Sequence, residues 1–154
     1  MLPYNPFKGK SVIVVGNSPR ILGKNLGNFI DSYDIVVRIN KFQIHGYEKD
    51  VGTKCNALHV NECVTKKNFE KIFSKCFPKI LWMGTRNKKR FCKKFGFSWD
   101  DWRIQEYHKY GHLTSGLSVI LHIISMIGNR PLHVIGIGGH SDPGYYYDQS
   151  QKCI

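Results

Sequence analysis

The chain has 154 residues, 42% of them hydrophobic and 13% aromatic, which predicts a compact globular domain and excludes a disordered chain. Its 23 basic and 11 acidic residues give a net charge of +12, so we expect attraction to nucleic acid, anionic membranes or acidic small molecules. The longest apolar segment, residues 117–127, is shorter than the ~20 residues that cross a bilayer. We therefore expect no transmembrane segment, and the first ten residues lack the apolar core of a signal peptide.

Short apolar runs that are rich in β-branched residues and closed by glycine or polar residues predict buried strands. In chain order, these runs are residues 11–16, 34–39, 57–60, 80–84 and 132–137. Apolar residues at helical spacing predict helices over residues 26–32, 66–77, 87–95 and 114–127. Thr114 and Ser115 are typical of a helix start, and Gly128 of a helix end.

Strands and helices alternate along the chain, and the strands are continuous apolar runs. This combination predicts a single-domain α/β/α Rossmann-like sandwich over residues 1–154, with a mostly parallel sheet of about five strands. In such sheets the ligand binds beyond the carboxyl ends of the strands. The segments that follow strands, where we expect the site, are residues 17–23, 40–45, 85–87 and 138–148.

The first of these segments follows Gly16 and begins Asn17-Ser18-Pro19. Backbone N–H groups where a strand turns into a helix can hold phosphate or ribose, and the helix dipole favours an anion there. The loop has neither G-x-G-x-x-G spacing nor a P-loop signature, so a plain turn is the alternative interpretation. Asn40 ends the second strand, and its amide can both donate and accept, as recognition of a base or ribose requires.

Three blocks of the chain resemble the large sialyl motif of the eukaryotic sialyltransferases. The first is Val-Val-Gly-Asn-Ser at residues 14–18, and the second is I-D-x-x-D-x-V-x-R-x-N at residues 30–40. The third is Gly-Tyr-Glu-Lys-Asp-Val-Gly at residues 46–52. A match of this length and spacing is far more specific than a lone glycine loop.

Two later segments are similar to further motifs of the same family. Leu-Thr-Ser-Gly at residues 113–116, followed by an apolar helix and a strand ending in G-x-G, resembles the small sialyl motif. Gly-Tyr-Tyr-Tyr-Asp at residues 144–148 resembles the third motif, H-Y-x-[DE], with Tyr145 where the family has His. Tyrosine can donate to a phosphate but cannot become a cation at neutral pH. Simple aromatic packing is the alternative interpretation of this cluster.

The resemblance implies a GT-A-variant fold of the sialyltransferase type, a CMP-sugar donor, a glycan acceptor, inversion at the anomeric centre, and no metal or other cofactor. The transferred group would be sialic acid or a related keto-acid sugar such as Kdo. The chain has no D-x-D sequence to hold a divalent ion. The residues expected to bind the donor are Asn17, Ser18, Asn40, Thr114, Ser115, Gly116, Gly138, Tyr145 and Tyr146.

The fourth motif of the family, H-x4-E, supplies the general base, and no such pattern follows Asp148. We expect the base either beyond Ile154 or at His140, which lies in the predicted loop after the last strand. A non-catalytic domain that binds a nucleotide or polyanion is the alternative function.

The resemblance implies that the disulfide of the family's Golgi members would lie at Val12 and Ile127 or their neighbours, and none of these residues is cysteine. The five cysteines of the chain show no C-x-x-C spacing, which argues against a zinc site. We therefore expect a soluble protein of a reducing compartment, cytoplasmic or from a bacterium or virus.

A cluster of basic residues gives the chain its strongest local positive charge. Its members are Lys88, Lys89, Arg90, Lys93 and Lys94. A solvated helix face is the simplest interpretation of this cluster, and contact with an anionic surface is the alternative. We do not expect a nucleic-acid partner.

Overall fold

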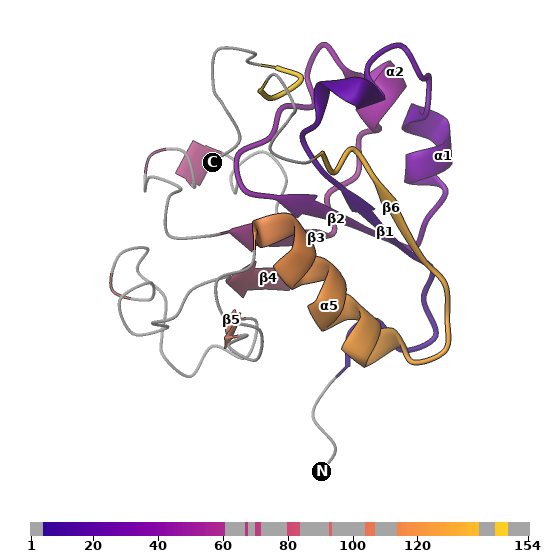
Figure 1. Ribbon diagram of the computed structural model, residues 1–154, viewed down its shortest axis with the longest axis vertical. Helices are drawn as coiled ribbons and strands as arrows, with labels where there is room; N and C mark the ends of the chain where they lie inside the picture. The colour runs from indigo at the N-terminus through magenta and orange to yellow at the C-terminus, as the bar shows by residue number, and fades with distance from the viewer. Residues whose placement is uncertain are drawn as a thin grey trace.

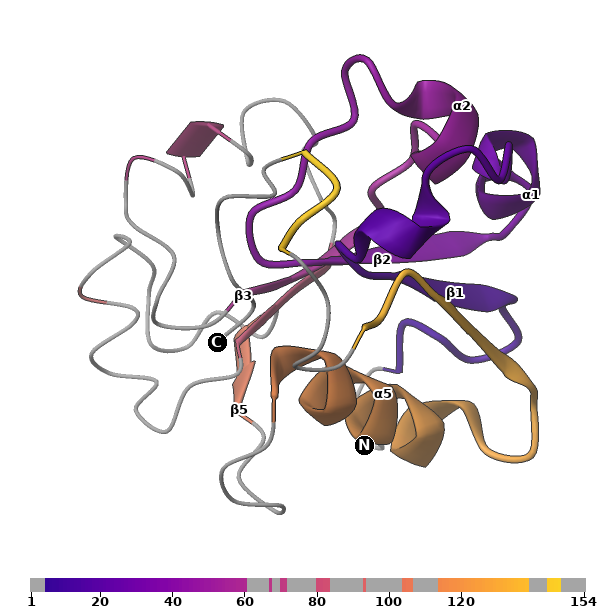
Figure 2. The same cartoon turned by 45° about the horizontal axis from the view of Figure 1, so that its top comes forward.

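The computed structural model describes residues 5–60, 67, 70–71, 80–83, 93, 104–106, 114–138 and 144–147. These residues form three layers, as Figure 2 shows. Helices α1 (Gly27–Asp31) and α2 (Glu48–Val51) cover one face of a sheet, and α5 (Ser115–Ile127) covers the other. The predicted α/β/α class is confirmed.

Within the described residues the sheet has six strands in the order β5-β4-β3-β2-β1-β6, and every neighbouring pair is parallel (Figure 1). The strands are β1 (Val12–Val15), β2 (Ile35–Ile39), β3 (Ala57–Val60), β4 (Ile80–Met83), β5 (Ile104–Glu106) and β6 (Leu132–Ile135). All five predicted strands are present, and β5 is additional. Because β6 lies beside β1 while β2 to β5 extend from its other side, the strand order reverses between β1 and β6.

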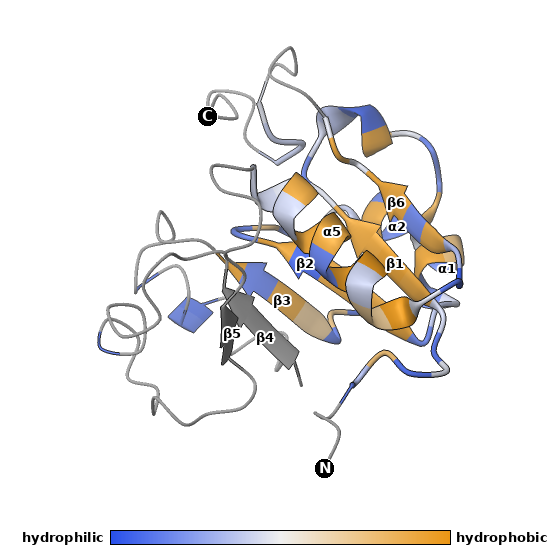
Figure 3. Ribbon diagram, turned by 60° about the horizontal axis from the view of Figure 1, so that its bottom comes forward, coloured by the Kyte–Doolittle hydropathy of each residue, from blue (hydrophilic) through white to orange (hydrophobic). Residues whose placement is uncertain are grey.

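Strands β1 and β2 are buried on both faces, which explains why all their residues except Arg38 are apolar. Successive side chains of β1 alternate between two apolar clusters. Val14 packs in the same cluster as Ile123 of α5, whereas its neighbour Ile13 packs in the same cluster as Ile30 of α1. Figure 3 shows the strongly apolar colouring of β1 between these helices.

Strand β6 corrects one expectation, because it is not a fully buried strand. It has β1 as its one partner among the described residues, and its two central residues, His133 and Val134, are exposed. The strand ends at Ile135, before Gly136, whose φ of +62° favours glycine.

The predicted helix 114–127 is confirmed as α5. The Thr114 hydroxyl accepts a hydrogen bond from the Leu117 N–H at 3.4 Å, and Gly128 ends the helix with φ +65°. Helix α1 is one residue shorter at each end than predicted. The 3-10 turn Pro19–Ile21 lies in the segment expected to be a loop after the first strand, and α2 lies in a stretch for which no element was predicted. The predicted helices 66–77 and 87–95 lie outside the described residues apart from residues 67, 70–71 and 93. No helix in the described ranges is both long and apolar enough to cross a bilayer.

Helices α1 and α2 approach each other closely at Gly27. A Cβ atom at this position would lie 2.2 Å from the Glu48 carbonyl oxygen, a distance that only a shift of the backbone could relieve. A Cβ atom at Gly116, by contrast, would meet the end of the Ile137 side chain at 3.0 Å, which can move aside.

We expect Gly27→Ala to lower the free energy of unfolding by about 3 kcal/mol, the upper end of the range for overpacking. Gly116→Ala is the matched control, because both glycines are helical and gain the same helix propensity from alanine. Urea unfolding of the three proteins measures the difference. Equal unfolding midpoints for the two variants would contradict the close approach of α1 and α2.

Candidate functional site at the carboxyl edge of the sheet

The segments that follow β1 and β6 lie side by side at the carboxyl edge, where the strand order reverses. The Gly16 N–H donates to the Ile135 carbonyl at 2.9 Å, and the Ser18 N–H donates to the Gly136 carbonyl at 2.8 Å. In open parallel sheets this position is the usual place for a ligand. The predicted location of the site is therefore the place where these two segments meet.

Glycine is required on both sides of this contact. A Cβ atom on Gly16 would lie 2.2 Å from the Gly136 carbonyl oxygen, and one on Gly136 would lie 3.0 Å from the Gly16 carbonyl oxygen. The two backbones therefore touch directly. Their other peptide groups can face a ligand with no side chain between them.

Asn17 joins this loop to the segment that follows β2. Its amide nitrogen donates to the carbonyl oxygens of Ile39 and Lys41, at 2.9 and 3.0 Å. Both amide hydrogens are used in these bonds, so Oδ1 is the atom that the half-buried Asn17 side chain can offer to a ligand.

Ser18 and Asn40 both take part in turns at this edge. The Ser18 side chain is buried, and its hydroxyl accepts a hydrogen bond from the Arg20 N–H at 3.3 Å. Asn40 has φ +54°, a left-handed conformation that asparagine tolerates, and its N–H donates to the His59 carbonyl. This conformation turns the chain away from β2 at the edge of the site.

The tyrosines of the third motif pack against the same segment. Tyr146 is only 3% exposed, and its N–H donates to the Asn17 carbonyl at 3.0 Å. Its hydroxyl donates to the Gln43 carbonyl and accepts from the Gln43 N–H at 3.1 Å. Burial raises the pKa of Tyr146 to about 12, so the hydroxyl keeps its proton. Tyr146, predicted to bind the donor, thus has a structural role at this edge.

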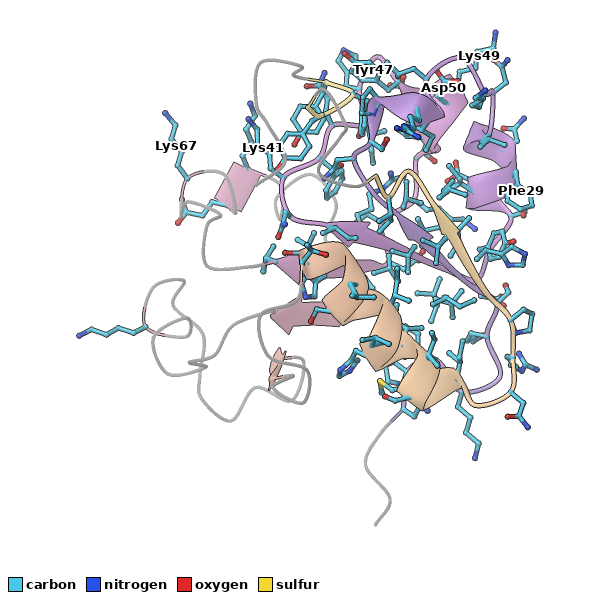
Figure 4. The ribbon with its side chains drawn as sticks, viewed as in Figure 1. Phe29, Lys41, Tyr47, Lys49, Asp50 and Lys67 are labelled. Atoms are coloured by element: carbon cyan, nitrogen blue, oxygen red, sulfur yellow. The ribbon has the colours of Figure 1, made fainter. Side chains whose placement is uncertain are left out.

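Tyr147 and Lys41, which the sequence analysis did not select, also lie at this edge. The Tyr147 hydroxyl donates to the Lys41 carbonyl at 2.6 Å, and its ring stacks on that of Tyr145 with 5.4 Å between centroids. The Lys41 ammonium lies 5.6 Å from the centroid of the Tyr147 ring, and Figure 4 shows Lys41 near residues 144–147, which are drawn in yellow. The feature of the sequence that could have identified Lys41 is its position directly after Asn40, a predicted site residue.

Helix α5 brings its amino-terminal end to the same place. It runs antiparallel to the strands, and the close contact of Gly116 with Ile137 shows that its first turn lies against the segment after β6. Thr114, half-buried Ser115 and Gly116 form this turn, and exposed Gly138 lies one residue beyond Ile137. A helix of 13 residues presents partial positive charge at this end, which favours a phosphate.

Other residues of the large motif hold the fold together through hydrogen bonds to backbone carbonyl and N–H groups. The buried Arg38 guanidinium donates to the carbonyl oxygens of Lys54 and Val51, both at 2.8 Å. Asp31 accepts from the N–H groups of Thr53 and Lys54 at 2.8 and 3.0 Å. Burial raises the pKa of Asp31, but these hydrogen bonds outweigh that effect and hold the pKa below its ordinary value. Arg38 and Asp31 therefore both fix the turn after α2.

The family assignment follows from the sequence profile of glycosyltransferase family 29 (sialyltransferase), which matches residues 3–93, more than half of the chain. The chain belongs to glycosyltransferase family 29. Over 42 residues, this family 29 chain is 55% identical to the CMP-N-acetylneuraminate-beta-1,4-galactoside alpha-2,3-sialyltransferase of Homo sapiens. Over 42 residues it is 48% identical to the CMP-N-acetylneuraminate-beta-galactosamide-alpha-2,3-sialyltransferase 4 of Mus musculus. Each stretch covers 27% of this chain and 11% or 13% of the relative.

Two solved structures share the fold of the family 29 chain. A mammalian sialyltransferase aligns with a TM-score of 0.65 at 17% identity, over 94% of this chain and 61% of its own. A mammalian sialyltransferase in complex with Gal-beta-1-3GalNAc-ortho-nitrophenol aligns with a TM-score of 0.62 at 21% identity, over 91% of this chain and 60% of its own. The family 29 chain thus spans about 60% of the length of these structures.

The other sequence predictions for the family 29 chain meet the structure only in part. His140, Asp148 and four residues of the basic cluster lie outside the described residues, while Lys93 is exposed. Val12 and Ile127, where the Golgi disulfide would lie, belong to one apolar cluster under α5, and the described Cys55 is not part of a disulfide. Within the described ranges, no three His, Cys, Asp or Glu side chains group as metal ligands would.

Asp50, which lies in the Gly-Tyr-Glu-Lys-Asp-Val-Gly block of the large motif, also holds a loop in place, and this role can be tested. Its carboxylate accepts from the N–H groups of Gly23 and Asn25 at 2.9 and 2.8 Å, and these bonds lower the pKa of Asp50 below its ordinary value of 3.8. A carboxyl whose pKa is lowered by folding stabilises the protein above its unfolded pKa. The stabilisation is lost as the pH falls through the lower folded pKa.

We therefore expect the urea midpoint of the wild-type chain to fall as the pH drops below about 4, and Asp50→Asn to reduce that fall. Asparagine cannot accept both bonds, so the variant is also less stable at neutral pH. Urea unfolding between about pH 7 and about pH 3 measures both effects. Parallel curves for the two proteins would show that the Asp50 carboxylate does not support this loop.

Proposed function

We propose that the carboxyl edge binds the cytidine nucleotide of a CMP-sugar, and that the whole protein transfers sialic acid, or a related keto-acid sugar such as Kdo, to a glycan hydroxyl. The observation that carries the proposal is the meeting of the three sialyl motifs at one edge. Asn17 of the large motif, the first turn of α5 and the tyrosine segment all converge there. Family membership supports the donor class, because the curated relatives are named as sialyltransferases that use CMP-N-acetylneuraminate.

The groups at this edge suit a nucleotide phosphate that gains charge. During transfer the acceptor oxygen forms a bond to the anomeric carbon, and the bond from that carbon to the phosphate oxygen breaks. CMP leaves with both bonding electrons and one additional negative charge, and the acceptor proton passes to a base. The α5 amino terminus and the Lys41 ammonium are positive groups that would stabilise the departing phosphate without a metal. Attack from the face opposite CMP would invert the anomeric centre.

Lys41 offers a direct test of donor binding. We expect Lys41→Gln to weaken CMP binding by about 10- to 100-fold, the range for loss of a hydrogen bond to a charged group. Lys49→Gln is the matched control, because Lys49 is an exposed cation on α2. Calorimetry with CMP and with GMP measures both the affinity and the base preference. Equal affinities for CMP and GMP, or equal effects of the two variants, would contradict the proposed site.

His140 offers the test of catalysis. If it acts as the general base, His140→Ala lowers the transfer rate by about 10²- to 10⁴-fold and leaves CMP affinity unchanged, because a base contacts the acceptor hydroxyl. His45→Ala is the control, since its side chain is 98% exposed and its Nδ1 lies 3.6 Å from a Glu48 carboxylate oxygen. The assay supplies labelled CMP-sialic acid and CMP-Kdo with mixed glycan acceptors. An unchanged rate places the base elsewhere, and CMP binding with no product supports the non-catalytic alternative.

A further inference from the structure

A second cleft lies at the opposite edge of the sheet, where β1 begins. It has a volume of about 400 Å³, within the range of small-molecule sites. Its walls come from the start of β1, from α1 and from the turn between α5 and β6. The lining residues are Lys10, Ser11, Val12, Phe29, Ser32, Tyr33, Arg130, Pro131 and His133. The length of β1 separates this cleft from Gly16, and Figure 4 shows Phe29 and Lys41 on opposite sides of the molecule.

Three rings form an aromatic wall in this cleft. The Tyr33 ring packs edge to face against Phe29 and against His133, with centroid distances of 5.3 and 5.2 Å. Tyr33 is buried, whereas Phe29 remains 46% exposed although it is a large apolar side chain. An exposed aromatic face held by a buried ring is suited to packing against a flat ring of a ligand.

Two cations provide the charge of the cleft. Neither Lys10 nor Arg130 forms an ion pair with any residue that the structure describes, and both are exposed. The nearby Asp34 carboxylate accepts from the backbone N–H and the hydroxyl of Ser11, both at 2.8 Å. These bonds, more than the nearby charges of Lys10 and Lys54, hold the pKa of Asp34 below its ordinary value, so its carboxylate has hydrogen-bond donors of its own.

The two serine hydroxyls of the cleft are already used within the protein. The Ser11 hydroxyl donates to Asp34, and the Ser32 hydroxyl donates to the Phe29 carbonyl at 2.7 Å. The main groups that remain for a ligand are therefore the aromatic wall, which includes the Tyr33 hydroxyl, and the two cations. A pair of cations that includes an arginine matches a doubly charged phosphate better than it matches a single carboxylate.

We propose that this cleft binds a small phosphate monoester that carries an aromatic ring. The ring packs on Phe29, and the phosphate lies between Lys10 and Arg130. The site is separate from the proposed donor site at the carboxyl edge and does not depend on it.

The test is an NMR titration of the isotope-labelled chain with phenyl phosphate while CMP is present at saturation. We expect shifts at the residues that line the cleft, and no displacement by CMP. Arg130→Gln and Phe29→Ala each weaken binding by about ten-fold or more, the loss expected for one charged or aromatic contact. Phe29→Leu keeps an apolar side chain for packing and should also weaken binding, which separates loss of the ring from loss of the fold.

Two control variants match the substitutions. Ile124 is an apolar residue that is 47% exposed on α5, and Lys49 is an exposed cation on α2, so Ile124→Ala and Lys49→Gln should leave the affinity unchanged. Inorganic phosphate lacks the aromatic ring and benzyl alcohol lacks the phosphate, so both should bind more weakly than phenyl phosphate. Absence of binding, displacement by CMP, or equal affinity in Arg130→Gln would overturn the proposal.

Discussion

The direct contact between the Gly16 and Gly136 backbones is the constraint on which the carboxyl edge depends. Parallel strands leave their carboxyl ends together, but side chains normally keep the following loops apart. Here the absence of side chains lets two peptide segments bond to each other at 2.9 and 2.8 Å. This contact fixes the position of Asn17, which directly follows Gly16. The hydrogen bonds of the Asn17 amide to Ile39 and Lys41 in turn fix the path of the segment after β2. One steric requirement thus fixes three loops.

The charged residues of the large motif act mainly within the protein. Asp31, Asp34 and Asp50 each accept two or more hydrogen bonds from loops that would otherwise be open, and Arg38 closes the turn after α2. A charged residue with its partners inside the fold is a structural element even when it lies in a family's signature. The motif therefore describes a frame around the ligand site as much as the site itself.

The class of fold could be predicted from the sequence because β1 to β3 are mostly apolar runs without polar alternation, a pattern that burial on both faces imposes. Strand β5 could not, since its three residues, Ile-Gln-Glu, carry no periodic signal and pair only with β4 among the described strands. Strand β6 also has an apolar sequence, but it lies at the edge of the sheet. Its edge position follows from the strand order, which the local sequence pattern does not reveal.

Sequence reasoning could place the candidate site at the carboxyl ends of the strands, but it could not give the contacts within it. Asn17 and Asn40 were selected because they follow strands, and the structure places both at the carboxyl edge. The bonds of Tyr146 to Gln43 join residues 103 apart in the chain, and no local pattern announces such a contact. The use of both amide hydrogens of Asn17 inside the protein is likewise a property of the folded chain alone.

The hydrogen bonds that hold the Asn17 amide also affect how readily this residue deamidates. An asparagine followed by serine loses its amide when the next backbone nitrogen attacks the side-chain carbonyl carbon. Here the Ser18 nitrogen is held by the Gly136 carbonyl, and the Asn17 amide is held by Ile39 and Lys41. The two reacting groups are therefore restrained from meeting. The native fold shields this position from spontaneous deamidation, and each unfolding event exposes it to that chemistry.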